Sequence, residues 1–547
     1  MASSPDDGMP ADSFDRTRAM FAHQLNRRNV LRLGLAGLGT AGLASFLAAC
    51  GGGTSSSGAG GAGAPPKPGG TVTIARNQDS VDFDKTMVFS NASIWVYVQM
   101  FEGLTIGSQD GRNVEPWLAE SWTQSDDQLT WTFKLKQGVT FSNGAPMTSA
   151  DVKFSLDEAS TTTGGWEFIN SAIDTVTAPD PATVVIKTKY PWAPLLADLA
   201  CPSNGIIPNN YGGTAKKDFY AAPVGTGPFV WDTWEKGNSL TLKKNPSYWR
   251  PGLPYLDSVT WQVVPDDNTR NVMIQGGTAQ INEFPPFSTV DQLKGVPDVT
   301  VTLFPSTRTD YILMNEQRPP YNDVHVRRAI SYAIDRESLV KAVLFGNGTA
   351  ANSLFMPTVP YYDKNTPGQT FDMAKAKAEM AMSSVPTGFT TTYLASSGDS
   401  TDAAIAQVLQ AALQQLGITM NITNSDPSAV HDMQTSLNYE ISHSYWTMDI
   451  NDPDELVQYA VLPEGGGHSF NTSYDNAQAR DLATQAEKTF DTAERQKIYT
   501  QLQTLLAEEA FLPALYYQPI PYALRSNVQG FSVRPTGLYD MATVSLA

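Results

Sequence analysis

The spacing of apolar residues changes along this chain, from every second position to every third or fourth position. Leu129, Trp131, Phe133 and Leu135 alternate with polar residues. This period of two is typical of a half-buried β-strand, because successive side chains of a strand point to opposite faces of its sheet. The same alternation is shorter at 72–74, 240–242 and 299–303.

Helical spacing dominates the later part of the chain. Asp323 suits an N-cap, because an apolar face follows it that comprises Val326, Ala329, Ile330, Ala333 and Ile334. Further apolar faces lie within 405–416, which ends at Gly417, and within 498–506. Because strands and helices both recur along 547 residues, the sequence predicts an α/β body with more than one lobe.

The first 50 residues have the layout of an export signal. A polar region ends in Arg27 and Arg28, and an apolar stretch with small residues at its end follows at 33–49. The paired arginines resemble a twin-arginine signal, and an ordinary secretory signal is the alternative. Leu47-Ala48-Ala49-Cys50 resembles a bacterial lipobox, in which the cysteine is lipidated and becomes the N-terminus after cleavage.

Residues 51–70 are rich in glycine, serine and proline, a composition typical of a flexible tether. We therefore expect a lipoprotein that Cys50 anchors to the outer leaflet of the cytoplasmic membrane, at the cell surface. A membrane-spanning helix over 33–49 is the alternative. With 17 residues, this stretch is at the short end of what spans a bilayer.

The charge of the chain restricts its partners. The formal net charge is −18, and residues 1–49 hold five arginines against four aspartates, so the rest of the chain is acidic. Such a body argues against nucleic acid as a partner, because phosphate binding needs clustered Lys and Arg. The only cysteines are Cys50 and Cys201. If Cys50 is lipidated, no disulfide forms within the chain, and we expect Cys201 to be a small buried residue.

No motif of a catalytic or metal site is found. The sequence has no GxSxG motif, no Walker A lysine and no HExxH, and its five histidines include no close pair. We therefore expect no enzyme, no cofactor and no metal. A glycosidase with two carboxylates is the enzymatic alternative, but nothing in the sequence favours it.

Several segments, in order, resemble the extracellular solute-binding proteins of the peptide/nickel class, family 5 (cluster C), which serve ABC importers. Together they extend over nearly everything after Gly70. The segments are MFEGLT (100–105), PWLAESW (116–122), DDQLTWTFKLKQGVTFSNGAPMTSADVKFSL (126–156), PVGTGPF (223–229), KKNPSYW (243–249), ILMNEQRPPYNDVHVRRAISYAIDRESLVKAV (312–343) and WTMDINDPDEL (446–456).

This resemblance implies a two-lobed clamp of the periplasmic-binding-protein type II fold, without catalysis or a cofactor. Lobe I would comprise 71–309 plus 519–547, with an extra subdomain at about 120–222, and lobe II would comprise 310–518. The chain would cross between them near Thr307–Tyr311 and near Tyr516–Pro521. The lobes would close on a peptide or other small solute and deliver it to a membrane permease. We expect a monomer.

The resemblance also implies a ligand site at Tyr445-Trp446-Thr447-Met448-Asp449. In peptide-binding relatives, the aspartate of the matching W-x-x-D motif holds the α-ammonium of the ligand. Asp449 would take this role, while Tyr445 and Thr447 offer backbone groups to an extended peptide and Trp446 offers a flat apolar wall. The alternative for Asp449 is a carboxylate that caps a turn. A calcium loop is disfavoured, because Pro453 and Asp454 stand where a ligand and a glycine are needed.

One departure from the family affects the expected ligand. Dipeptide binders carry an arginine for the ligand carboxylate, and the matching stretch Tyr393–Ala404 contains none. A dipeptide fixed at both ends is therefore disfavoured. A longer peptide, a cationic solute or an oligosaccharide remains open, and so does a sensory rather than a transport role. Phe89, Asn91 and Asn315 are weaker candidates for ligand contact, with packing or capping as their alternative.

The lipobox interpretation predicts where the protein is found in the cell. Cys50→Ser removes the thiol that would carry the lipid, so the variant should leave the membrane fraction and become soluble outside the cell. Fractionation followed by immunoblotting measures this. Retention of the variant in the membrane would support the spanning helix instead.

Overall fold

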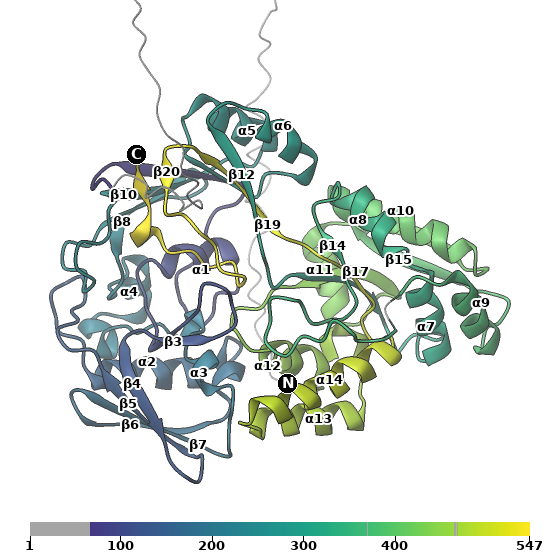
Figure 1. The fold of residues 1–547 in the computed structure, drawn as a ribbon, viewed down its shortest axis with the longest axis horizontal. Coiled ribbons are helices and arrows are strands. Elements are labelled where there is room, and N and C mark those ends of the chain that lie inside the picture. The colour runs from purple at the N-terminus through teal and green to yellow at the C-terminus, as the bar shows by residue number, and fades with distance from the viewer. Residues whose placement is uncertain (1–65, 369, 464–466, 468) are drawn as a thin grey trace, which may run out of the picture. The chain divides into compact units, whose positions relative to one another are not determined.

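The structure is a computed structural model that describes residues 66–547, apart from 369, 464–466 and 468. The leader, Cys50 and residues 51–65 of the tether lie outside the described residues. No helix of the described part is long and apolar enough to cross a bilayer. Within 66–547 the chain is mixed α/β, as the sequence predicts, and its two large sheets belong to different lobes (Figure 1).

The first lobe is built on a seven-stranded sheet. Its central strands β10, β1 and β11 are parallel, and the remaining strands pair antiparallel. In spatial order the strands are β12 (Val299–Phe304), β19 (Ile520–Arg525), β11 (Ile281–Glu283), β1 (Thr71–Arg76), β10 (Ser258–Val263), β9 (Ser239–Lys244) and β8 (Phe229–Glu235). The predicted alternations at 72–74, 240–242 and 299–303 all lie in these strands.

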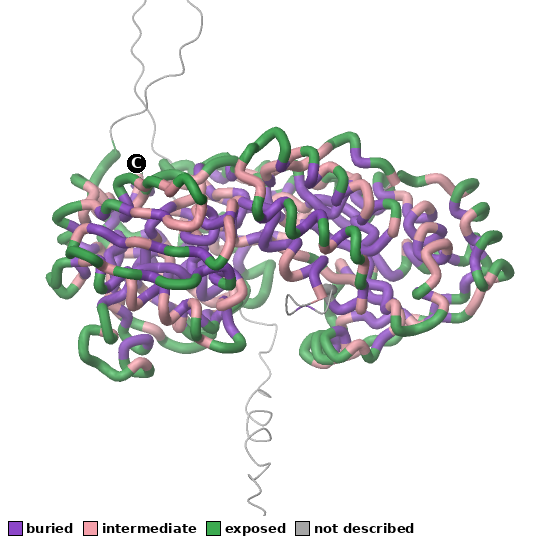
Figure 2. The backbone as a smooth tube through the Cα atoms, turned by 90° about the horizontal axis from the view of Figure 1, so that it is seen from below, coloured by how far each residue is buried: buried purple, intermediate pink, exposed green. Residues whose placement is uncertain are grey.

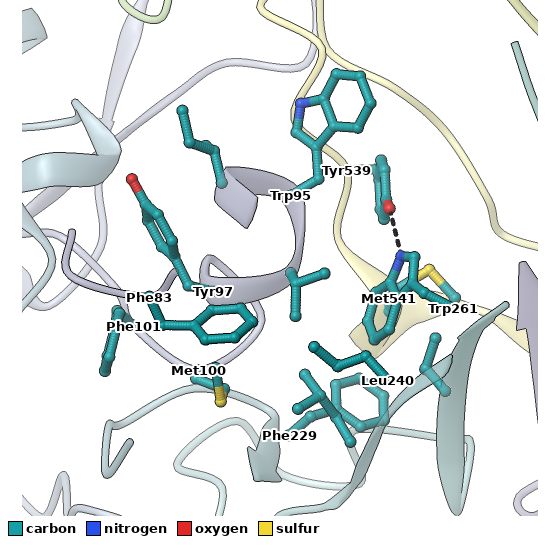
Figure 3. Close-up of a cluster of buried hydrophobic side chains, with 14 of the residues drawn as sticks. Phe83, Trp95, Tyr97, Met100, Phe101, Phe229, Leu240, Trp261, Tyr539 and Met541 are labelled. Carbon is teal, nitrogen blue, oxygen red and sulfur yellow. Dashed lines mark hydrogen bonds between the residues drawn. The ribbon is translucent and has the colours of Figure 1, made fainter. Parts of the chain in front are cut away.

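Aromatic side chains fill the core beside this sheet. Helix α1 (Asn91–Tyr97) contributes Trp95 and Tyr97 to the same apolar cluster as Phe229, Leu240 and Trp261 of the sheet (Figure 3). Trp261 of β10 donates from its indole nitrogen to the Tyr539 hydroxyl at 2.9 Å, so the C-terminal segment is bound to the middle of the sheet. The helices α5 (Asp267–Gly276) and α6 (Val290–Lys294) follow β10 and β11.

A separate antiparallel sheet forms a subdomain within the chain of the first lobe. Its order is β4 (Ala119–Gln124), β5 (Thr130–Leu135), β7 (Thr183–Thr188) and β6 (Ile173–Asp180). The predicted alternation is confirmed in β5, where Trp131, Phe133 and Leu135 are buried. Shorter elements accompany the subdomain: β2 (Thr105–Gly107), β3 (Val114–Pro116), α2 (Ser149–Thr161), α3 (Leu195–Asp198) and α4 (Lys216–Ala221).

The second lobe is built on a six-stranded sheet with a helical layer and an apolar core on each side. Its order is β14 (Thr349–Ala350), β18 (Ala514–Tyr517), β13 (Thr309–Met314), β17 (Ile441–Trp446), β15 (Thr390–Ser396) and β16 (Thr419–Ser425). Its helices are α7 (Val324–Ala333), α8 (Arg336–Val343), α9 (Met373–Met382), α10 (Ser400–Gln414), α11 (Pro427–Thr435), α12 (Asp454–Leu456), α13 (Ala477–Lys488) and α14 (Thr492–Glu508).

The helical predictions of the sequence are confirmed here. The Asp323 carboxylate accepts from the backbone N–H of His325 at 2.9 Å and caps α7. The face within 405–416 belongs to α10, and Gly417 beyond its end has a φ of +77°, a conformation that glycine adopts readily. Buried residues fill the interior of both lobes, and exposed residues form their outer surfaces (Figure 2).

The chain passes between the two large sheets twice. It leaves the first sheet after β12 and enters β13 through residues 305–308, and it returns from β18 to β19 through residues 518–519. These crossovers lie within or beside the expected crossings, Thr307–Tyr311 and Tyr516–Pro521. Figure 1 shows β12 and β19 side by side where they leave the first lobe.

One buried carboxylate joins the end of α1 to distant parts of the first lobe. Glu102 accepts four hydrogen bonds of 2.8–2.9 Å, from Trp117, Thr226, Tyr248 and Trp249. Burial raises the pKa of Glu102 to about 7, although these four donors favour its charged form. The carboxylate therefore holds three separate segments of chain together.

Glu102→Gln should destabilise the fold. The amide group of glutamine donates instead of accepting, so two of the four donors lose their acceptor, and the free energy of unfolding should fall by about 2 kcal/mol or more. Urea unfolding measures this. Glu120→Gln on the exposed face of β4 is the matched control and should change the value by less than about 0.5 kcal/mol. Equal stability of the two variants would contradict the role of Glu102.

Candidate functional site

The two crossovers are hydrogen-bonded to each other. The Ser306 hydroxyl donates to the backbone carbonyl of Gln518 and accepts from the N–H of Arg308 at 3.0 Å. The N–H of Gln518 in turn donates to the carbonyl of Arg308 at 3.4 Å. The N–H of Thr307 donates to the carbonyl of Pro535 in the first lobe at 2.8 Å. The junction between the lobes is therefore a small hydrogen-bonded unit rather than two independent linkers.

The same unit holds the segment that the sequence predicts as the ligand site. Thr307 uses its hydroxyl twice, since Oγ1 donates to the carbonyl of Met448 at 3.0 Å and accepts from the N–H of Met448 at 2.9 Å. Upstream, Tyr445 pairs with Asp310 and Trp446 pairs with Thr309 in the antiparallel ladder of β17 and β13. Residues 445–449 therefore lie beside the first crossover, at the end of the second sheet that faces the first lobe.

Asp449 follows β17 and is oriented by a second acid. The Glu455 carboxylate, fully buried, accepts from the N–H groups of Asp449 and Ile450 at 2.8 and 3.0 Å. Within the described part of the chain, no side chain or backbone group donates to the Asp449 carboxylate or forms an ion pair with it. Burial raises the pKa of Asp449 to about 7. The site therefore holds an uncompensated carboxylate, which a cation would stabilise.

The first lobe faces Asp449 with Tyr97 and Cys201. Burial, and after it the charges of Cys201 and Asp449, raise the pKa of Tyr97. Burial and then the charge of Asp449 raise the pKa of the Cys201 thiol, which is buried as expected from the sequence. Among the described residues, none hydrogen-bonds the buried Tyr97 hydroxyl. The charge of Asp449, in the second lobe, therefore acts on groups of the first lobe, which places Asp449 on the side of its lobe that faces the other.

Further carboxylates make this region strongly acidic. Burial, as the largest cause, raises the pKa values of Asp198, Asp454 and Glu455 well above their usual range. Asp452 is compensated, because both guanidinium ends of Arg495 donate to it at 2.5 and 2.9 Å. A positive group placed among these acids would favour their charged forms. No cluster of three or more His, Cys, Asp or Glu in the described ranges could hold a metal ion.

A row of aromatic rings crosses from one lobe to the other. Trp446 stacks on Tyr459 with ring centroids 4.5 Å apart, and Tyr459 lies 6.1 Å from Phe168 of the first lobe. Phe168 continues to Trp166 at 5.8 Å, and Trp166 stacks on Phe89 at 4.6 Å. Phe89 is half exposed, at 52%. Two of the predicted residues, Trp446 and Phe89, are thus the two ends of one row.

The other predicted residues are placed differently. Tyr445 is exposed beside the first crossover, and Thr447 follows the end of β17. Asn91 opens α1, the helix that carries Tyr97. Asn315 lies at the opposite end of β13 from the crossover, about 20 Å along the strand. Its amide donates to the carbonyls of Leu437 and Tyr439 at 2.8 and 2.9 Å. The hypothesis that Asn315 contacts ligand is therefore not supported, because its side chain binds backbone inside the second lobe.

Four residues of this region escaped the sequence analysis: Tyr97, Thr307 as a binder of Met448, Glu455 and Tyr459. Glu455 belongs to the acidic stretch that follows Asp449, so its proximity in sequence was a usable signal. Thr307 fell within the predicted crossing, but no pattern links it to Met448, which lies 141 positions away. Tyr97 and Tyr459 carry no sequence signal beyond apolar spacing.

Comparisons with known proteins agree on one family. The model described as "Bacterial extracellular solute-binding proteins, family 5 Middle" matches residues 113–468. The glutathione-binding protein GsiB of Escherichia coli is 32% identical over 479 residues, which cover 85% of this chain and 92% of GsiB.

Solved structures have the same fold. DppA of Helicobacter pylori, in complex with the peptide STSA, superposes with a TM-score of 0.76 at 27% identity, over 88% of this chain and 98% of DppA. AppA of Bacillus subtilis, in complex with a nonapeptide, gives a TM-score of 0.76 at 25% identity, over 88% of this chain and all of AppA.

The raised pKa of Asp449 predicts a pH dependence of stability. A carboxyl whose pKa is raised by folding contributes stability below its unfolded value, near 4, and loses it as the pH rises through about 7. Asp449→Asn should therefore raise the free energy of unfolding of the ligand-free protein above that of the wild type. This gain should be larger at pH 8 than at pH 5, by on the order of 2 kcal/mol. Urea unfolding at both pH values measures it. The exposed Asp481→Asn is the control, and parallel pH profiles for both variants would contradict the interpretation.

Proposed function

The chain belongs to family 5 of the bacterial extracellular solute-binding proteins, and from this premise we propose that it captures a peptide-like solute between its lobes and delivers it to the permease of an ABC importer. The single observation that carries the choice of solute is the Asp449 carboxylate, which lies between the lobes without a cationic partner among the described residues. A ligand ammonium supplies the missing charge.

The names of the relatives point to the same class of ligand. GsiB is named for glutathione, DppA was solved with a peptide and AppA with a nonapeptide. All three ligands are peptides, and a peptide offers an amine together with backbone groups. Trp446 supports an apolar part of such a ligand, and Tyr445 and Thr447 supply backbone for strand-like pairing. Phe89 and Asn91 border the same region from the first lobe.

The mechanism uses the two crossovers as the axis of closure. Lobe I comprises 71–309 plus 519–547 with its subdomain at about 120–222, and lobe II comprises 310–518. Residues 305–308 and 518–519 absorb the change of angle when the lobes close. The protein acts as a monomer, anchored through Cys50 at the cell surface, possesses no cofactor and leaves its solute unaltered.

An oligosaccharide is the second candidate. The aromatic row from Phe89 to Trp446 favours it, because planar rings stack on the apolar faces of sugars. An oligosaccharide carries no ammonium, however, and would leave Asp449 uncompensated. A sensory role with the same ligand chemistry would use the same site.

Asp449→Asn separates these candidates. For a peptide with a free amine, the variant should bind about 10- to 100-fold more weakly, because one charge-assisted hydrogen bond is lost in a dry site. Calorimetry with glutathione and with a tripeptide library measures the affinity. Asp432→Asn, on the exposed surface of α11, is the control and should bind as the wild type does. Unchanged affinity in Asp449→Asn would refute the role of the carboxylate.

A further inference from the structure

A guanidinium lies in the first crossover itself. Arg308 directly precedes β13, and its Nε and Nη2 donate to the two oxygens of Asp310, both at 2.8 Å. The guanidinium carbon lies 3.7 Å from the ring centroid of Tyr445. The fork-like ion pair and the aromatic stack together fix both the plane and the direction of the guanidinium. Arg308 is therefore held in one orientation before any ligand arrives.

Asp310 cannot take up the remaining donors of Arg308. Its side chain is fully buried, both of its oxygens accept from Arg308, and Oδ1 also lies 3.1 Å from Nε2 of His443. Against the effect of burial, the charge of Arg308 lowers the pKa of Asp310 to about 2. The acid is thus ionised and occupied by two partners. The Nη1 donors of Arg308 need an acceptor from outside this pair.

The free end of the guanidinium is accessible. Among the described residues, none accepts a hydrogen bond from Nη1 of Arg308. The Arg308 side chain is 22% exposed, and the Tyr445 on which it stacks is 49% exposed. Because Nε and Nη2 are bonded to Asp310 and one face of the guanidinium lies on Tyr445, Nη1 is the nitrogen that remains for a solute.

The position of Arg308 relates it to Asp449. Thr309 pairs with Trp446, and Thr307 binds Met448, so residue 308 lies across from Thr447. Tyr445 and Asp449 are two residues to either side of Thr447. An oriented cation and an uncompensated anion therefore flank the same short piece of chain, at the junction between the lobes.

From this arrangement we propose that Arg308 is a specificity-determining residue, which binds a carboxylate of the solute through Nη1 while Asp449 binds its amine. The inference rests on the proposed function and deepens it, because it selects solutes with both charges over solutes with an amine alone. The stretch Tyr393–Ala404 contains no arginine, and the crossover supplies the cation instead. Arg308 lies in the first crossover, which bends when the lobes close. A solute whose carboxylate binds Arg308 therefore also contacts the crossover.

Matched peptides test the proposal. The probes are a tripeptide library with free carboxylates, the same library with C-terminal amides, and glutathione, each measured by native mass spectrometry and then by calorimetry. The wild type should prefer the free acids by about 10- to 100-fold, the effect of one charge-assisted hydrogen bond. Arg308→Gln should bind acids and amides alike, at the level at which the wild type binds amides.

Two further variants guard against a purely structural effect. Arg308→Lys keeps the charge without the fork and should retain part of the preference for acids. Arg250→Gln is the matched control, because Arg250 also pairs with an acid, Asp540, and stacks on an aromatic ring, Trp117, but lies in the first lobe. Its preference for acids should equal that of the wild type. Thermal melting of each variant shows whether it is folded.

The outcomes separate the inference from the function on which it rests. If the wild type binds acids and amides equally, or if Arg308→Gln weakens both equally, the inference is overturned and the proposed function stands. If the wild type binds no peptide in either form, the proposed function itself is overturned. A preference for acids that survives in Arg308→Gln would assign the carboxylate to another residue and would also overturn the inference.

Discussion

The hydroxyl of Thr307 connects the two tasks of this protein. This hydroxyl binds the N–H and the carbonyl of Met448. The backbone N–H of Thr307 donates to the carbonyl of Pro535 in the first lobe. The residue that begins the passage between the lobes is thereby joined to the loop that carries Asp449. Because hydrogen bonds are directional, a rotation at the crossover should move this loop with it. The position of Asp449 is thus tied to the same few atoms that form the first crossover.

The acids around this junction give it a defined preference. Asp449, Glu455, Asp454 and Asp198 lie in a region where burial disfavours their charged forms. Their neighbour Asp452 differs from them, because it forms an ion pair with Arg495. Groups of this kind are costly in an empty site and are stabilised when a cation arrives. Buried titratable groups with perturbed pKa values are common at functional sites.

Much of the fold could be predicted from local pattern, and less of the site. The alternation in β5, the capping Asp323 and the helix that ends before Gly417 are local features, and all were correct. The ordered family segments gave the two-lobed class and drew attention to Trp446 and Asp449. The pairing of Thr307 with Met448, and the effect of the Asp449 charge on Tyr97, join positions far apart in the chain, where no period or motif applies. For Asn315, the contacts favour the alternative of a capping role, since its amide binds the carbonyls of Leu437 and Tyr439. The sequence places this residue on a strand without saying which end faces the partner lobe.

The row of rings that crosses between the lobes has an optical consequence. Phe168 and Tyr459 are its only neighbouring pair that belongs to different lobes, and a tryptophan lies on each side of this pair, at Trp166 and Trp446. When the lobes separate, the indole rings of Trp166 and Trp446 enter a more polar environment and become more exposed to water. The protein therefore carries its own emission signal for the opening and shutting of the clamp, without an attached dye.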